Sequence, residues 1–585
     1  MSSYKAPLRE IEFVLHDVLN AGQLATLPGY AEATRDTMDG LLGEAAKLVE
    51  ERLAPLNAGA DAGCRWRDGE VATPPGFKEF YKLYSDGGWI GVSNPTEYGG
   101  LGLPYLLAKV VEELECSGSV AFALYPGLTI GCFEALHANA SEPIKQFYLP
   151  KLCTGEWSGT MCITEPQAGT DLGSIKSKAA PQADGSYLVD GSKIFISSGE
   201  HDLAGNIVHF VLARLPDSPA GVKGLTTFVV PKLLPKADGS PGERNKVRCT
   251  SIEHKMGLHG SATCSLAFEG ARGWIVGQPN QGIQNMFVMM NMERIMVAFQ
   301  GLGLCELVTQ NAIRYALDRK QGKAASGSPH IADHADVRRM LLTMKAVTEG
   351  GRAMSYDTAL HVDLARRHPE AAVREAAQDY IELTTPVIKA FMTDAAVELG
   401  STGVQVYGGH GYIKEHGIEQ AMRDAKILCL YEGTNGIQAM DLVRRKLMLN
   451  NGRLPQRFFD KARAELNQAR TDGLDLQFIE KPLTAALAEI EATTKWLQQS
   501  YKSNPDDAGF SAADYLRAFA LAMLGYHWLR MARAAARSKD PAFAQAKRVT
   551  AEFFAQRLLP QMHALCGVVR NSAKSMMELP AASLQ

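Results

Sequence analysis

Glu432 is the residue whose type and setting are best suited to chemistry, since an aromatic residue precedes it and a glycine follows it. Helical patterns lie on both sides, and Asn435 with Gln438 three residues later is typical of a helix-capping pair. We therefore expect Glu432 in a short connector ahead of a helix. Burial beside Tyr431 would raise its pKa and nearby helix N–H groups would lower it, which suits a general base near neutral pH. The alternative is a surface Glu in a Gly-containing loop.

The elements that must position this acid belong to a large, ordinary globular chain. It has 585 residues, 46% hydrophobic and 21% charged, enough for several domains and a sizeable core. A net charge of −3 and a pI of about 6.6 argue against a general nucleic-acid binder. Ten scattered cysteines without a C-x-x-C pair favour buried thiols in a reducing compartment.

Neither a leader sequence nor a membrane span is expected. The first seven residues contain no apolar core of a signal peptide. The most apolar segment by inspection, residues 286–299, is interrupted by Glu293 and Arg294. We therefore predict a cytoplasmic protein without a membrane partner.

Hydrophobic periodicity divides the chain into four parts. Apolar residues recur at helical spacing up to about residue 155, short β-branched and aromatic runs follow, and helical patterns return from residue 281. The predicted class is a multidomain α+β fold, with an N-terminal helical domain, a middle antiparallel β-barrel or sandwich, a helical bundle and an additional C-terminal helical domain. The predicted boundaries are 1–158, 159–277, 278–450 and 451–585.

Two local patterns refine this division. The pair Asp190-Gly191 between the apolar runs 187–189 and 193–196 predicts a β-hairpin with a two-residue turn. Asn450-Asn451-Gly452 predicts a break ahead of the last domain. That domain shows amphipathic helices and no catalytic constellation, so we interpret it as a packing or oligomerisation domain.

The residues around Glu432 also carry a family resemblance. Together, the segments 407–412, 422–426 and 431–434 closely resemble the C-terminal signature of the acyl-CoA dehydrogenase family. The resemblance implies that Glu432 removes the α-proton of an acyl thioester. It further implies that Tyr431 and Gly433 contact the substrate, and that the Glu432 N–H and a flavin ribityl hydroxyl polarise the thioester carbonyl.

A second resemblance concerns residues 161–171, MCITEPQAGTD, which are similar to the flavin-binding segment of the same family. It implies FAD as cofactor. Contacts expected from this segment and from the neighbouring strand are Met161, Ile163, Thr164, Gly169, Thr170, Phe195 and Ser197. Thr170 is also expected near the substrate. Phe195 stands where the family usually has Trp, so the aromatic face remains but the indole N–H is lost; without the resemblance, Phe195 would be ordinary hairpin core.

Further cofactor contacts are implied by resemblance elsewhere. Arg319 matches an Arg that reaches the FAD diphosphate of a neighbouring subunit, a task that suits the guanidinium fork. Gln405 and Gly409 match adenosine-end contacts, and Thr434 matches a flavin contact. Because the implied target of Arg319 belongs to another subunit, we expect a homo-oligomer, at least a dimer.

Arg294 corresponds to a family Arg near the catalytic base and is expected on the substrate side, where its charge would keep Glu432 ionised. The alternative is an ion pair within its own helix. His330 and His334 show metal-like spacing with Asp333, but no third supporting ligand is evident, and we predict no metal.

The resemblance, which covers residues 80–450, predicts an FAD-dependent dehydrogenase that converts an acyl-CoA to the trans-2-enoyl-CoA. The opening residues and the extension resemble the branch that acts on 3-methylmercaptopropionyl-CoA, a compound of dimethylsulfoniopropionate catabolism; other members take short or medium straight-chain acyl-CoAs. Electron-transfer flavoprotein is the expected acceptor. The alternatives are an acyl-CoA oxidase that uses oxygen and a catalytically silent binding protein on the same fold. Acyl-chain length lies beyond the sequence.

Overall fold

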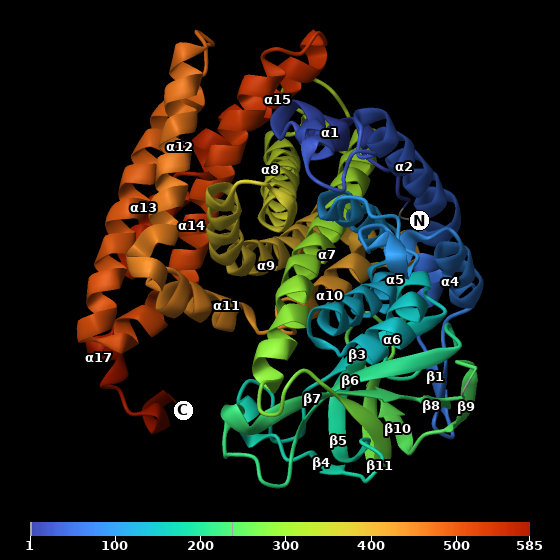
Figure 1. Ribbon diagram of the computed structural model, residues 1–585. Helices are drawn as coiled ribbons and strands as arrows, with labels where there is room; N and C mark the ends of the chain where they lie inside the picture. Colours follow the sequence, from blue (N-terminus) through green and yellow to red (C-terminus); the bar gives the residue numbers. More distant parts are fainter. Residues whose placement is uncertain (1–2, 237, 585) are drawn as a thin grey trace. The chain divides into compact units, whose positions relative to one another are not determined.

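The computed structural model describes residues 3–236 and 238–584, and the chain forms two compact units. One comprises Lys47–Met296. The other comprises Met1–Ala46 together with Val297–Gln585. Figure 1 shows the elements of both units.

In the unit Lys47–Met296, the long helix α5 (Tyr105–Asn139) forms the helical core, and α4 (Phe77–Asp86) and α6 (Glu142–Thr154) accompany it. The short elements are α3 (Asn57–Ala60), β1 (Arg65–Arg67) and β2 (Glu70–Ala72). By length and composition α5 resembles a membrane span, but 89% of its most apolar window is buried in the protein. It is thus a core helix, and the choice of residues 286–299 as the most membrane-like segment was wrong.

The rest of this unit is a seven-stranded sheet. Its strands are β3 (Trp157–Cys162), β4 (Lys178–Pro181), β5 (Tyr187–Ser197), β6 (Asn206–Arg214), β7 (Leu225–Pro231), β10 (Val247–Ile252) and β11 (Thr263–Val276). Pairing runs from β11 through β5, β4, β6 and β7 back to β11, which closes a barrel. The predicted β-barrel is confirmed, although β6 pairs in parallel with both β3 and β4. A separate ribbon is made by β8 (Leu233–Pro235) and β9 (Pro241–Arg244).

The predicted hairpin at Asp190-Gly191 was wrong, because β5 runs straight through both residues and stays paired with β11. Gly191 has φ 148°, and a Cβ there would lie 2.2 Å from the Ser177 hydroxyl. The glycine therefore permits a close approach of neighbouring backbone and does not form a turn.

The unit that contains Val297–Gln585 is helical. Its bundle consists of the later part of α7 (Gly282–Asp318), α8 (Ala335–Arg367), α9 (Ala371–Tyr407), α10 (Ile418–Leu428) and α11 (Asn435–Asp441). The helix α1 (Leu8–Glu12) and most of α2 (Arg35–Leu48) belong to the same unit. The helical pattern predicted from residue 281 onward begins with the single long helix α7.

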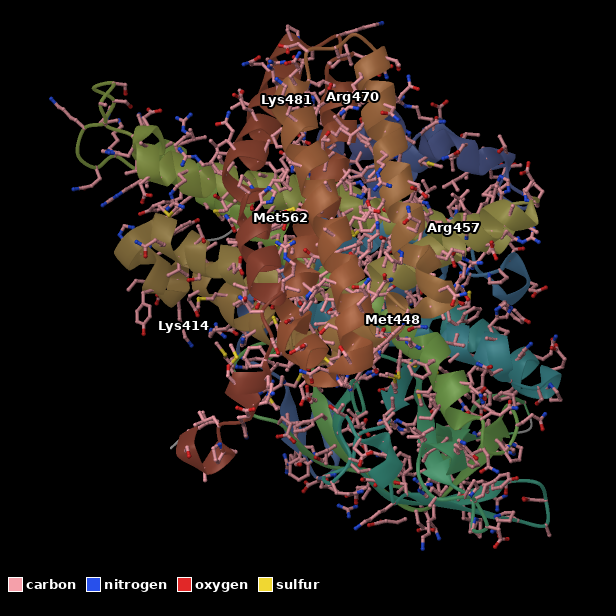
Figure 2. All side chains as sticks on the ribbon, turned by 90° about the vertical axis from the view of Figure 1, so that its left-hand side faces the viewer. Lys414, Met448, Arg457, Arg470, Lys481 and Met562 are labelled. Atoms are coloured by element: carbon pink, nitrogen blue, oxygen red, sulfur yellow. The ribbon has the colours of Figure 1, made fainter. Side chains whose placement is uncertain are left out.

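The last residues of the chain add a second layer of helices, α12 (Arg453–Thr471), α13 (Gln477–Ser503), α14 (Pro505–Ala535), α15 (Pro541–Phe553), α16 (Gln561–Val569) and α17 (Lys574–Met577). The predicted break is present: Asn450, Asn451 and Gly452 have φ of 50°, 58° and 81°. Figure 2 shows α12 and α13 side by side, with Arg470 and Lys481 at the same end.

The extension is tied to the start of the chain. Phe13 and Phe543 meet edge to face with their ring centroids 5.0 Å apart, and Arg9 pairs with Asp540. The buried ammonium of Lys547 lies 2.7 Å from Glu349 on α8. The N-terminal segment, the bundle and the extension therefore share one core.

Candidate active site

The loop between α10 and α11 holds Glu432 in a left-handed backbone conformation, with φ 56°, and Gly433 follows with φ 83°. Glycine adopts this conformation freely, whereas for other residues it costs about 1–2 kcal/mol and persists only where the surroundings enforce it. The Glu432 side chain is half-buried. A strained acidic residue in a connector agrees with the expected position of the base.

Two polar side chains, Lys389 and Gln438, hold this backbone. Lys389, buried on α9, donates to the Gly433 carbonyl at 3.0 Å and to the Asn435 side-chain oxygen at 2.9 Å. The Gln438 amide donates to the carbonyls of Glu432 at 3.1 Å and Gly433 at 3.2 Å. The main-chain carbonyls of Glu432 and Gly433 are therefore both fixed by hydrogen bonds, and the backbone that carries the acid is held in place.

The start of α11 differs by one residue from the predicted capping pair. Thr434 is the N-cap, and its hydroxyl oxygen accepts from the Ile437 N–H at 3.3 Å. Asn435 instead donates to Asp394 of α9 at 2.8 Å. The prediction of Asn435 and Gln438 as caps was wrong, because Asn435 makes tertiary contacts with α9 and Gln438 donates to the carbonyls of Glu432 and Gly433.

Tyr431 precedes the acid, and its hydroxyl donates to the side-chain oxygen of Gln300, a fully buried residue of α7. The Tyr431 ring is half-buried and is held at its far end by this bond. An aromatic wall thus lies directly beside Glu432, as the sequence predicts.

The ends of α7 and α9 bring together the predicted diphosphate and adenosine contacts. Tyr315 and Tyr407 stack with their ring centroids 4.0 Å apart and their planes 14° apart. Arg319 follows one stacked tyrosine by four residues, and Gln405 and Gly409 flank the other at two residues' distance; all three are exposed. A guanidinium, an amide and an unhindered glycine therefore lie exposed near the stacked tyrosines, and their role as cofactor contacts stays a prediction.

The segment 161–171 is anchored by a buried ion pair that sequence reasoning missed. The Lys193 ammonium lies 2.8 Å from the Glu165 carboxylate and also donates to the carbonyls of Ile163 at 2.9 Å and Leu212 at 2.8 Å. Both side chains are almost completely buried. The segment is therefore fastened to β5 and β6 through one lysine.

Several interactions determine the ionisation of Glu165. Burial alone would raise its pKa, but the Lys193 ammonium and hydrogen bonds from Ser177 and from the Lys176 N–H lower it to about 2. Glu165 is therefore a permanent carboxylate at neutral pH. Its position inside the recognised motif was the available signal, whereas nothing in the sequence pointed to Lys193 or Lys389.

The remaining residues of this segment leave hydrogen-bonding groups available. Within the part of the chain that the structure describes, the hydroxyls of Thr164, Thr170 and Ser197 form no hydrogen bond. Gly169 and Thr170 are exposed, Met161 is half-buried at the end of β3, and Ile163 is buried. Unpaired donors beside exposed backbone suit the polar edge of a flavin ring.

Phe195 is not hairpin core. It has φ 58° and lies in a β-bulge, where Ile194 and Phe195 of β5 oppose the single residue Ser265 of β11. The bulge leaves the ring 59% exposed. A large exposed aromatic side chain on a strained backbone agrees with a face for a planar ligand.

Arg294 is buried on α7 and donates to the Asn291 side chain, three residues back, at 3.4 Å. Its expected role beside the base stays a prediction.

Of the residues with metal-like spacing, Asp333 pairs with Arg338 at 2.7 Å and the His334 ring lies 3.0 Å from the Gln321 carbonyl. These contacts are to protein groups.

Known protein families contain domains that match this chain over most of its length. Four domain models match in order along the chain: acyl-CoA dehydrogenase N-terminal domain at residues 36–156, middle domain at 160–271, C-terminal domain at 280–447, and an acetyl-CoA dehydrogenase C-terminal-like domain at 458–580. The chain belongs to the acyl-CoA dehydrogenase family, whose members are FAD-dependent oxidoreductases.

Three individual relatives are similar to this chain over nearly its whole length. The chain is 42% identical to 3-methylmercaptopropionyl-CoA dehydrogenase of Ruegeria pomeroyi, over 96% of this chain and 97% of that protein. It is 32% identical to the broad-specificity linear acyl-CoA dehydrogenase of Mycobacterium tuberculosis over the full length of both. An FAD complex of an acyl-CoA dehydrogenase from Bacillus anthracis, 21% identical, shares the fold with a TM-score of 0.75 over 95% of this chain and 92% of that one.

The residues present fit the cofactor that the family uses. Phe195 offers an exposed aromatic face, and the hydroxyls of Thr164, Thr170 and Ser197 are unpaired. These are the groups that a flavin ring requires, a stacking face and donors to its oxygen and nitrogen atoms.

Proposed function

We propose that this protein removes two hydrogens from the α and β carbons of an acyl-CoA and forms the trans-2-enoyl-CoA, with Glu432 as the base. The observation that carries this is the Glu432 loop: an acid at φ 56°, whose neighbouring carbonyls are fixed by Lys389 and Gln438. A base must lie within hydrogen-bond reach of the proton it takes, so a backbone that is held in place suits a residue that abstracts a proton.

The chain's own residues divide the work. Glu432 accepts the α-proton, Arg294 supplies the cation that keeps a carboxylate ionised, and Tyr431 with Gly433 borders the acyl chain. FAD, when bound, supplies the acceptor for the β-hydride at N5. Met161, Ile163, Thr164, Gly169, Thr170, Phe195, Ser197 and Thr434 would hold the flavin ring.

Arg319, Gln405 and Gly409 would hold the diphosphate and adenosine end of FAD. Their exposure on one surface of the bundle leaves them open to a neighbouring subunit, which supports a homo-oligomer of at least two chains. We further propose an electron-transfer flavoprotein as the acceptor and a cytoplasmic location.

The substrate is proposed to be 3-methylmercaptopropionyl-CoA, because a protein of that activity is 42% identical over 96% of this chain. The second candidate is a short or medium straight-chain acyl-CoA, which the likeness to a linear acyl-CoA dehydrogenase supports. In the first case the protein would act in dimethylsulfoniopropionate catabolism.

Anaerobic titration of the purified flavoprotein tests this proposal. Loss of the oxidised flavin absorbance is recorded with 3-methylmercaptopropionyl-CoA, butyryl-CoA and octanoyl-CoA. We expect complete bleaching with at least one thioester and little peroxide when the same turnover is run in air. Rapid peroxide formation would indicate an oxidase, and no bleaching with any thioester would contradict the proposal.

A further inference from the structure

A second candidate site lies where the extension meets the bundle, away from any residue assigned above. A pocket of about 270 Å³ is enclosed by α8, α9 and α12. Its lining includes the apolar side chains of Leu364, Val373, Leu454 and Phe458 as well as the polar side chains of His361 and Lys461. Arg457, which also borders the pocket, marks this junction in Figure 2. The pocket is therefore amphipathic.

The polar side is organised around one ammonium group. Lys461 Nζ lies 3.0 Å from His361 Nε2, 3.9 Å from the Asp357 carboxylate and 4.4 Å above the centre of the Tyr380 ring. His361 donates through Nδ1 to the Asp357 carbonyl at 2.6 Å, so its Nε2 accepts from the lysine. The Lys461 side chain keeps 35% of its surface exposed. Lys461 is one of the residues that line the pocket.

Positive charge exceeds negative charge in this cluster. Lys461 and Arg530, which lies 3.2 Å from Asp357, share that single carboxylate. Two histidines of the cluster, His361 and His527, add no charge. Burial lowers the pKa of His361 to about 4 and that of His527 to about 3, so both are neutral at pH 7. A partly buried cluster with one surplus cation favours an anion.

The nearest charged neighbours do not cancel this surplus, because they are already matched with one another. Asp379 and Glu375 pair with Arg453 and Arg457, and Glu465 and Asp472 pair with Arg533 and Arg537. The cluster also contains unmet hydrogen-bonding capacity. His527 is fully buried, and among the described residues neither of its ring nitrogens has a hydrogen-bond partner.

We propose that this pocket binds an aliphatic monocarboxylate, whose carboxylate pairs with Lys461 while its chain packs on Leu454 and Phe458. One negative charge balances the surplus cation, and a carboxylate oxygen can accept a charge-assisted hydrogen bond from the Lys461 ammonium. The volume lies just below the range of about 300–1,000 Å³ for drug-sized ligands, which indicates a short chain. An amine would be repelled, and an amide or alcohol would leave the charge unmatched.

Isothermal titration calorimetry of the FAD-loaded protein with sodium hexanoate tests the proposal, with hexanamide and inorganic phosphate as comparison ligands. We expect saturable binding of hexanoate at one site per chain, and no measurable binding of the other two over the same concentrations. Lys461→Met should weaken hexanoate binding by about tenfold or more, the loss expected for one charged hydrogen bond. Lys461→Arg should retain most of the affinity.

Two further variants separate the pocket from other sites, including one for acyl chains. Lys481→Met removes an exposed lysine of α13 and should leave binding unchanged. Ala376→Leu fills the pocket from an exposed position of α9 and should abolish binding without lowering the melting temperature. The proposal is overturned if hexanoate does not bind, if hexanamide or phosphate binds equally well, or if both Lys461→Met and Ala376→Leu leave binding unchanged. If Lys461→Met fails to fold, Ala376→Leu alone decides.

Discussion

The Glu432 loop and the segment 161–171 are both irregular stretches fastened to regular elements, but different groups hold them. The loop is held by amide side chains and by Lys389, which donates to a main-chain carbonyl. The segment is held by the buried ion pair of Lys193 with Glu165. The hydrogen bonds that hold the loop carbonyls involve no carboxylate, whereas the ion pair depends on a carboxylate staying ionised. The Glu432 loop, which is proposed to remove the proton, and the segment 161–171, which is proposed to bind the flavin, should therefore lose their structure under different conditions.

The largest expected effect concerns the segment 161–171. Lys193→Met leaves Glu165 buried without its cation, which should destabilise the protein by about 3–5 kcal/mol. Chemical denaturation measures this, with Lys178→Met, at an exposed position of β4, as the control within about 0.5 kcal/mol of the wild type. A Lys193→Met protein as stable as the control would mean that the ion pair is not the anchor.

A pH series tests the same pair without removing the lysine. The pKa of Glu165 falls from 4.5 to about 2 on folding. The unfolded state therefore binds more protons between these values, and Glu165 contributes about 3 kcal/mol that is complete above pH about 5 and disappears as pH falls through about 2. The difference in unfolding free energy between wild type and Glu165→Gln should shrink over that window. A difference independent of pH would contradict this assignment.

A substitution that loosens the Glu432 loop should change the free energy of unfolding less than Lys193→Met does, and should have a larger effect on the rate of flavin bleaching. Lys389→Met removes two donors, at a cost of about 2 kcal/mol, and should slow flavin bleaching by about tenfold because the backbone that carries the base is no longer held in place. Lys426→Met, at an exposed position of the adjacent α10, is the matched control. Unchanged bleaching in Lys389→Met would show that the lysine does not position the base.

The smallest expected effect is the difference in stability between alanine substitutions of two glycines near Glu432, Gly433 and Gly436. Gly433→Ala forces a side chain to φ 83° and should cost about 1 kcal/mol. Gly436→Ala lies in the first turn of α11 without a positive φ and should be neutral or stabilising by about 0.5 kcal/mol. Melting temperatures compare the two, and equal effects would contradict the left-handed assignment.

Much of this arrangement could be predicted from the sequence. Helical periodicity and the turn residues at 450–452 located the bundle and the extension, because these signals are local. Gly191 was misread, since the requirement for it comes from Ser177, fourteen residues away in the chain and adjacent only in the fold. Lys193 and Lys389 were missed for the same reason: a buried lysine shows its partner only in three dimensions.

The candidate site, too, could be predicted from the sequence only in part. The motif residues around Glu432 and Glu165 could be recognised by type and order. The helix cap moved from Asn435 to Thr434 because a contact with α9 outweighs the local preference. The bulge at Phe195 requires knowledge of the register of β11, which no pattern within β5 supplies.

The most direct measurement of the central proposal is single-turnover flavin bleaching by Glu432→Gln under anaerobic conditions, with FAD content determined in the same sample. If Glu432 takes the α-proton, the variant retains FAD and bleaches about 10²–10⁴-fold more slowly than the wild type. A fully FAD-loaded Glu432→Gln protein that bleaches within a few-fold of the wild-type rate would contradict the assignment of the base.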